Sequence, residues 1–106
     1  MNLKERKCVP CEGGVPAMTL GKISELMKEL KDWSLESGHI VKYLKFKDFK
    51  ENIDFVNKVA NLAEQEGHHP NLIINYDKLK IELWTHAIHG LSENDFILAA
   101  KIDELE

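Results

Sequence analysis

The sequence lacks any long hydrophobic run. None of its stretches approaches the roughly 20 apolar residues that a membrane-spanning helix needs, and the charged segment 1–7 does not resemble a secretory signal. The chain also lacks an excess of basic charge, since 18 acidic residues outweigh 14 basic ones and leave a net charge of −4. Phosphate backbones attract basic surfaces. We therefore expect no nucleic acid as principal ligand, no membrane association and a cytoplasmic location.

Cysteine and proline are scarce. Cys8 and Cys11 are the two cysteines of the chain. A structural zinc site normally needs four ligands, and the sequence does not offer them. A thioredoxin-type pair needs a preceding strand and a following helix, and neither is expected around these cysteines. Residues 1–18 hold two of the three prolines and a Gly-Gly pair. We predict that they form a reduced, extended arm that does not dock firmly and is dispensable, with intermolecular metal binding or a redox bridge as alternatives.

Apolar residues make up 43% of the 106-residue chain and follow two periodicities. Helical spacing predicts three helices, and alternation predicts two hairpins. In chain order we expect a helix over 19–32, a hairpin of 33–36 and 40–46, a helix over 49–66, a hairpin of 72–76 and 79–85, and a helix from 92 with Leu98, Ala99, Ile102 and Leu105 inward. Because hairpins make antiparallel sheets, we predict one two-layer α+β domain over 19–106. Its four-stranded antiparallel sheet carries three helices on one face.

The run His68-His69-Pro70 stands between the second helix and the second hairpin. Histidine titrates near neutral pH, and a buried imidazole needs hydrogen-bond partners. Glu64 lies one helical turn before His68 and can reach the same face, while His86 ends the last strand-like run. This set predicts an acid–base site. The structural alternative is a helix end satisfied by imidazoles, with Glu64 in solvent and His86 exposed.

Three further features bear on this site. Asp95 is the last member of a capping box that begins at Ser92, so it either supports the site or only caps its helix. Trp33 opens a strand, where its ring could line a pocket, although a core position is the usual alternative. A metal held by the histidines is disfavoured, because adjacent histidines on an extended backbone point apart and a His-Glu-x-x-His spacing is absent.

The spacing of these residues resembles the signature of the pterin-4α-carbinolamine dehydratases: Glu64-x₃-His68-His69-Pro70-x₅-Tyr76-x₉-His86-x₈-Asp95. The resemblance covers about residues 19–105 and includes Trp33. It implies dehydration of 4a-hydroxytetrahydrobiopterin, or a related carbinolamine, to the quinonoid dihydropterin, which returns to the cycle of aromatic amino acid hydroxylases. It also implies a homodimer or homotetramer, with no metal and no organic cofactor.

The same resemblance implies roles for single residues. His68 and His86 are the expected acid and base, and His69 completes the catalytic set by binding and orienting the pterin. Glu64 and Asp95 would support the site, with Glu64 orienting His68. Trp33 would bind the substrate near the pterin ring. The alternatives are a non-enzymatic dimerisation or interaction module and a pterin-related role in molybdopterin metabolism.

Overall fold

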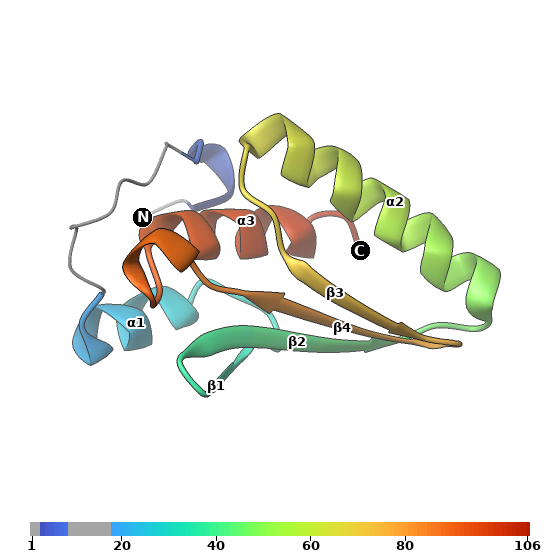
Figure 1. Ribbon diagram of the computed structural model, residues 1–106, viewed down its shortest axis with the longest axis horizontal. Helices are drawn as coiled ribbons and strands as arrows, with labels where there is room; N and C mark the ends of the chain where they lie inside the picture. The colour runs from blue at the N-terminus through green and yellow to red at the C-terminus, as the bar shows by residue number, and fades with distance from the viewer. Residues whose placement is uncertain (1–2, 9–17) are drawn as a thin grey trace.

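The computed structural model describes residues 3–8 and 18–106 (Figure 1). Cys11, and with it the predicted alternative of a redox bridge to Cys8, lies outside the described residues. The elements in chain order are a short 3-10 helix η1 (Leu3–Glu5), α1 (Leu20–Met27), β1 (Ser34–Glu36), β2 (His39–Lys45), α2 (Phe49–Glu66), β3 (Asn71–Asn75), β4 (Lys78–Leu83), a short 3-10 helix η2 (His86–Ile88) and α3 (Glu93–Asp103). Within these residues, no helix has the length and apolar character to cross a membrane.

The four strands form one sheet in the order β1-β2-β4-β3, with every neighbouring pair antiparallel. The two predicted hairpins join through β2 and β4, where Ile40 pairs with Leu83. Alternate residues of β4, Leu79, Ile81 and Leu83, are buried on the face that the helices cover, because side chains alternate along a strand. The predicted α+β fold is confirmed.

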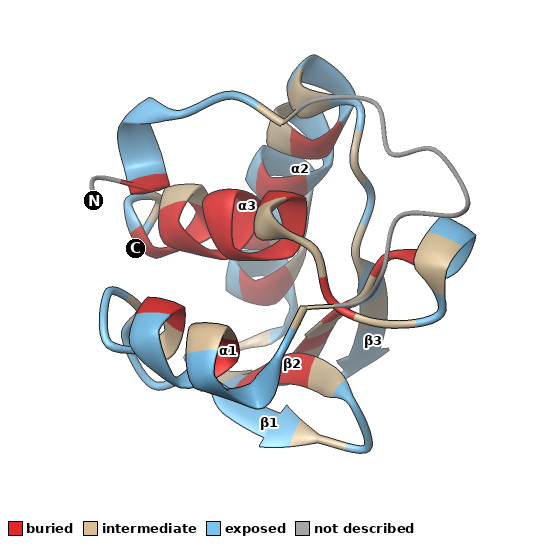
Figure 2. Cartoon of the chain, turned by 90° about the vertical axis from the view of Figure 1, so that its left-hand side faces the viewer, coloured by how far each residue is buried: buried red, intermediate tan, exposed pale blue. Residues whose placement is uncertain are grey.

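All three helices contribute to one core. α3 is buried over most of its surface, and Figure 2 shows it in the middle of the molecule, with α2 above it and α1 and β2 below it. Its buried apolar residues meet side chains from the sheet and from the two other helices, among them Ile23 and Leu26 of α1, Phe55 and Val59 of α2, and Phe96, Leu98 and Ile102 of α3. A helix buried all round is held by tertiary packing, so α3 is a rigid support for whatever its two ends carry.

Local signals set the bounds of α2 as predicted. Asp48 accepts the Glu51 N–H at 2.9 Å and caps the first turn. At the other end Gly67 adopts a left-handed conformation with φ of 67°, which ends the helix. The chain therefore leaves α2 sharply just before His68. The predicted capping box of Ser92 is also present at the start of α3.

Two predicted boundaries are wrong. α1 ends at Met27 rather than near Asp32. The reason is tertiary, because the Lys31 N–H donates to Asp103 Oδ2 at 2.9 Å instead of to a helical carbonyl. The last strand ends at Leu83, and His86 opens η2 rather than ending a strand.

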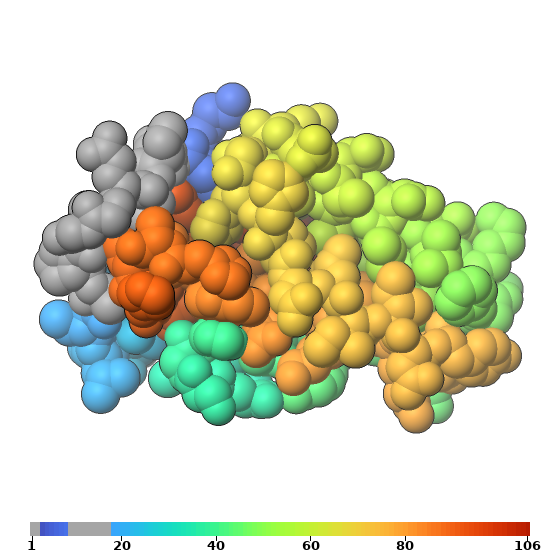
Figure 3. All heavy atoms as spheres, in the orientation of Figure 1, coloured from blue at the N-terminus to red at the C-terminus, as the bar shows by residue number. Residues whose placement is uncertain are grey.

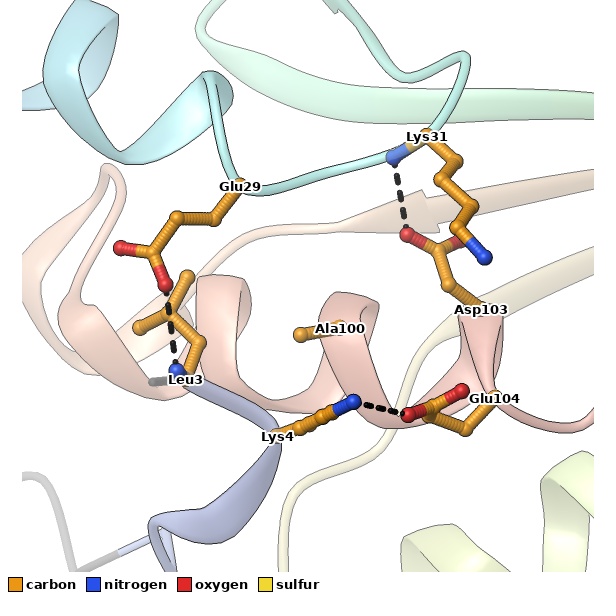
Figure 4. Close-up of a pocket in the computed structure, with 7 residues that line it drawn as sticks. All are labelled: Leu3, Lys4, Glu29, Lys31, Ala100, Asp103 and Glu104. Carbon is orange, nitrogen blue, oxygen red and sulfur yellow. Dashed lines mark hydrogen bonds and ion pairs between the residues drawn. The ribbon is translucent and has the colours of Figure 1, made fainter. Parts of the chain in front are cut away.

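The prediction that the N-terminal arm does not dock is wrong for its described part. Leu3 is 1% exposed and belongs to the core. Figure 4 shows Leu3 and Ala100 of α3 among the residues that line a small pocket, and the Leu3 N–H donates to Glu29 Oε1 at 3.2 Å. Lys4 forms a 2.7 Å ion pair with Glu104. One apolar residue in a charged segment has no periodicity, so the sequence pattern could not reveal this anchor.

Candidate active site

The centre of the candidate site is an imidazole–carboxylate pair formed by His68 and Asp95. His68 Nε2 lies 2.6 Å from Asp95 Oδ1, and the Asp95 side chain is fully buried. The second carboxylate oxygen accepts the Thr85 hydroxyl at 2.8 Å and the Ser92 N–H at 3.0 Å. The His68 side chain keeps 13% of its surface exposed. The buried Asp95 carboxylate, which accepts hydrogen bonds on both oxygens, thus fixes one nitrogen of the His68 imidazole, while part of that ring still reaches the surface.

Three elements bring this pair together. Gly67 turns the chain out of α2, and Pro70 restricts the preceding residue, His69, to extended conformations, so the backbone around His68 is constrained from both sides. Asp95 stands in the first turn of α3, where the free N–H groups and the helix dipole favour a negative charge. Figure 3 shows the segment after α2 and the segment after β4 on the same face of the molecule.

Glu64 does not contact His68 as predicted. Its Oε2 lies 2.5 Å from His69 Nε2 instead, and both side chains are mostly exposed, His69 by 61% and Glu64 by 77%. The predicted contact applied helical spacing to His68, which lies beyond the helix end, and Gly67 in its left-handed conformation redirects the chain before His68. An exposed pair of this kind contributes little stability. The carboxylate that supports His68 is Asp95.

His86 lies on the solvent side of the sheet, next to an aromatic stack. Its ring centroid is 4.4 Å from that of Trp84, and a second imidazole, His39, is stacked on Trp84 with a centroid distance of 4.1 Å and an interplanar angle of 7°. His39 Nδ1 is 2.7 Å from Glu82 Oε2. That contact is the largest cause of a lowered pKa of Glu82. His86 follows Thr85 directly, so the Asp95 network and the aromatic stack meet at this point of the chain.

Trp33 lies away from this site. It is 8% exposed, and its Nε1–H donates to Asp103 Oδ1 at 2.8 Å. Asp103 stands eight residues after Asp95 on α3, which is roughly 12 Å along the helix axis. The predicted substrate-binding role of Trp33 is therefore corrected to a core position.

Sequence reasoning missed Thr85 and His39 as partners, whereas the bond from the Ser92 N–H to Asp95 is the one that the predicted capping box implies. The inward alternation of β4 does predict that Thr85 is buried, and a buried hydroxyl needs a partner, so this signal was available. His39 could not be found, because its neighbours come from the pairing of β2 with β4 across the two hairpins. Within residues 3–8 and 18–106, no three His, Cys, Asp or Glu side chains are grouped to hold a metal ion.

Comparison with known proteins shows the family to which this chain belongs. The family model described as pterin 4 alpha carbinolamine dehydratase matches residues 16–105. A Rickettsia bellii protein named "Putative pterin-4-alpha-carbinolamine dehydratase" is 53% identical, covering 99% of this chain and 95% of its own. An Alkaliphilus metalliredigens protein of the same name is 43% identical, covering 97% and 95%. This chain belongs to the pterin-4-alpha-carbinolamine dehydratase family.

Solved structures agree with this fold. A protein from Brucella melitensis described as a transcriptional coactivator/pterin dehydratase has a TM-score of 0.79 and 28% identity, covering 84% of this chain and 97% of that one. A pterin dehydratase-like protein described as a RuBisCO assembly factor of the alpha-carboxysome has a TM-score of 0.61 and 22% identity, covering 73% and 92%. The second likeness concerns the fold alone.

Proposed function

We propose that this protein dehydrates 4a-hydroxytetrahydrobiopterin, or a related pterin 4a-carbinolamine, to the quinonoid dihydropterin and water by histidine acid–base catalysis. The observation that carries the proposal is the His68–Asp95 pair, a partly exposed imidazole held at 2.6 Å by a fully buried carboxylate. Membership of the family supplies the substrate class. The fold by itself would not suffice, because one fold serves many functions.

The reaction needs two proton movements and no covalent intermediate. The leaving 4a-hydroxyl must receive a proton, and a ring nitrogen of the pterin must lose one. Imidazoles suit both steps, because histidine can gain or lose a proton near neutral pH. In our proposal His68 and His86 carry these protons, Asp95 orients His68, and the exposed His69 binds the pterin. Trp84 replaces Trp33 as the aromatic ring beside the site, through its contact with His86.

We further propose that the protein acts as a homodimer or homotetramer in the recycling of tetrahydrobiopterin, supplying an aromatic amino acid hydroxylase in the cytoplasm. Support for self-association comes from the sheet. β3 is an edge strand, and Ile73, Ile74 and Tyr76 on and beside it are exposed. An edge with free backbone groups and apolar side chains can pair with a second copy.

A direct assay tests the proposal. The purified protein is added to the carbinolamine, and formation of the quinonoid dihydropterin is followed against the spontaneous reaction. We expect a large acceleration that saturates with substrate. A folded protein that does not accelerate dehydration would contradict the proposal and favour an interaction module. Acceleration restricted to a molybdopterin-related carbinolamine would instead change the physiological substrate.

A further inference from the structure

Residues 3–8, which we call the strap, join several parts of the molecule. η1 packs along α3, and Leu3 anchors it in the core with 1% exposure. Backbone N–H groups of the strap donate to Glu29 after α1 and to Glu66 at the end of α2. Its basic side chains form ion pairs with Glu93 and Glu104 at the two ends of α3. A segment with this many long-range partners is part of the folded domain.

The last residue of the strap, Cys8, connects α2 to α3. Its N–H donates to Glu66 Oε1 at 2.9 Å, and its thiol donates to the Asn94 carbonyl with Sγ at 3.6 Å. Glu66 also accepts Lys101 Nζ of α3 at 2.9 Å, and the carboxylate side chain is only 5% exposed. Cys8 therefore bridges the final turn of α2 and the first turn of α3.

This bridge lies beside the proposed acid–base pair. Glu66 precedes His68 by two residues, and Asn94 directly precedes Asp95. The contact between His68 and Asp95 spans the same two elements that Cys8 connects. On the other side of the undescribed residues, the Met18 N–H donates to the Leu91 carbonyl at 3.1 Å, so the chain returns to the start of α3.

The protonation states of Cys8 and Glu66 favour the hydrogen bonds of this bridge. Burial, and after it the negative charge of Glu66, raises the pKa of Cys8 to about 12. The side chain therefore remains a thiol that can donate a hydrogen bond. Burial alone would raise the pKa of Glu66, but the Cys8 N–H and Lys101 outweigh it and lower that pKa. Glu66 thus remains a carboxylate that accepts both bonds at neutral pH.

We propose that the strap holds the distance between α2 and α3, and that Cys8 is a positioning residue for the His68–Asp95 pair. This inference rests on the proposed function for its effect on turnover, but not for its effect on the pair itself. Small displacements of a catalytic group can be costly, because proton transfer requires the donor and acceptor to be in hydrogen-bond reach.

The test compares full-length variants that remove one contact at a time. Lys101→Met removes the ion pair with Glu66 and keeps the Cys8 N–H acceptor, so it is the reference. Adding Glu66→Leu to it removes that acceptor. Cys8→Ala removes the thiol bond, and Cys8→Ser restores a donor. Lys4→Met breaks a strap contact at the far end of α3 and is the matched control.

Two readouts are taken. One is kcat and KM for carbinolamine dehydration, and the other is the exchange rate of the His68 imidazole proton, which NMR measures without substrate. We expect the Glu66→Leu, Lys101→Met double variant to lose roughly 10-fold in kcat against Lys101→Met. KM should change by less than about twofold, because binding is not the step affected. The His68 proton should exchange faster in the double variant and in Cys8→Ala, while Cys8→Ser and Lys4→Met should match the parent.

A lowered melting temperature with parental kcat and parental His68 exchange would overturn the proposal and leave the strap a purely structural element. Since the exchange rate is measured in the resting protein, a protein without dehydratase activity would still decide between these outcomes. Failure of the proposed function and failure of the strap are therefore distinguishable.

Discussion

The two ends of α3 each carry a buried aspartate, and the two differ in their partners. Asp95, at the first turn, contacts the His68 imidazole, the Thr85 hydroxyl and a backbone N–H. Asp103, at the last turn, accepts Lys42 Nζ at 2.6 Å, the Trp33 indole and a backbone N–H. Both oxygens of each carboxylate accept hydrogen bonds. They differ in the side chain that contacts the carboxylate, which is an imidazole at Asp95 and an ammonium at Asp103.

The partner of Asp103 remains charged. Lys42 is 2% exposed, and burial alone would lower its pKa, but the hydrogen bonds with Asp103 and Glu106 outweigh this and raise that pKa. An imidazole, by contrast, can gain and lose a proton at physiological pH. In our proposal, therefore, a buried carboxylate supports acid–base chemistry at one end of α3, while a buried carboxylate at the other end stabilises the fold.

The largest expected effect is on turnover at the Asp95 end. His68→Ala and His86→Ala should each lower kcat by roughly 10²–10⁴-fold, because each removes a principal proton carrier. His69→Ala should chiefly raise KM. His89→Asn is the matched control, since His89 is an exposed histidine whose left-handed backbone asparagine tolerates. Parental rates in all three alanine variants and in their triple combination would show that the site is assigned wrongly.

The next largest effect is on stability at the Asp103 end. Asp103→Ala should cost about 3–5 kcal/mol of unfolding free energy, because it leaves the Lys42 ammonium buried without its main partner. Denaturant unfolding measures this, and kcat below the melting transition should stay near the parent value. Asp103→Leu combined with Lys42→Met should restore most of the stability. A fall in kcat as large as that of His68→Ala would remove the distinction between the two ends.

A smaller effect should appear at alkaline pH. Because the pKa of Lys42 is raised on folding, its contribution to stability is complete below the unfolded-state pKa of about 10.4 and is lost as the pH rises through the higher folded-state value. Urea unfolding is measured at successive pH values above the unfolded-state pKa of Lys42. The unfolding free energy should fall more steeply with pH in the parent than in the Lys42→Met, Asp103→Leu variant. That comparison separates Lys42 from other groups that titrate there. Equal slopes would mean that Lys42 contributes nothing.

The smallest expected effect is that of chelation, which should leave turnover unchanged. The proposed proton transfers use imidazoles alone, and the spacing of His68, His69 and His86 does not form a ligand helix. Activity is measured before and after exhaustive dialysis against a chelator. Stoichiometric metal whose removal abolishes activity and whose return restores it would contradict this expectation.

How far the sequence predicts the structure depends on how local the signal is. The predicted bounds of α2 are correct, because they depend on Asp48 and Gly67, which act on neighbouring residues of the chain. The end of α1 was not, because it depends on a bond between Lys31 and Asp103, 72 positions away. The burial of Leu3 likewise depends on packing against distant segments, α3 among them.

The candidate site likewise has features that the sequence predicts and features that depend on tertiary packing. The spacing of its residues predicts which histidines and carboxylates belong together, but it does not predict which of them pair. His68 takes Asp95, 27 positions away, rather than the nearby Glu64. That choice is made by the packing of α3 against the end of α2, which no local pattern encodes.

The most direct test of the central claim is the turnover of Asp95→Asn against that of Asp103→Asn. Asparagine keeps the shape of each side chain but replaces one accepting oxygen by an NH2 donor. At position 95 the change therefore removes the negative charge together with an acceptor for either His68 or the Thr85 and Ser92 groups. We predict that Asp95→Asn lowers kcat by roughly 10²-fold or more, while Asp103→Asn is less stable but turns over at the parental rate below its melting transition. Equal loss of turnover in the two variants, or no loss in Asp95→Asn, would contradict the account.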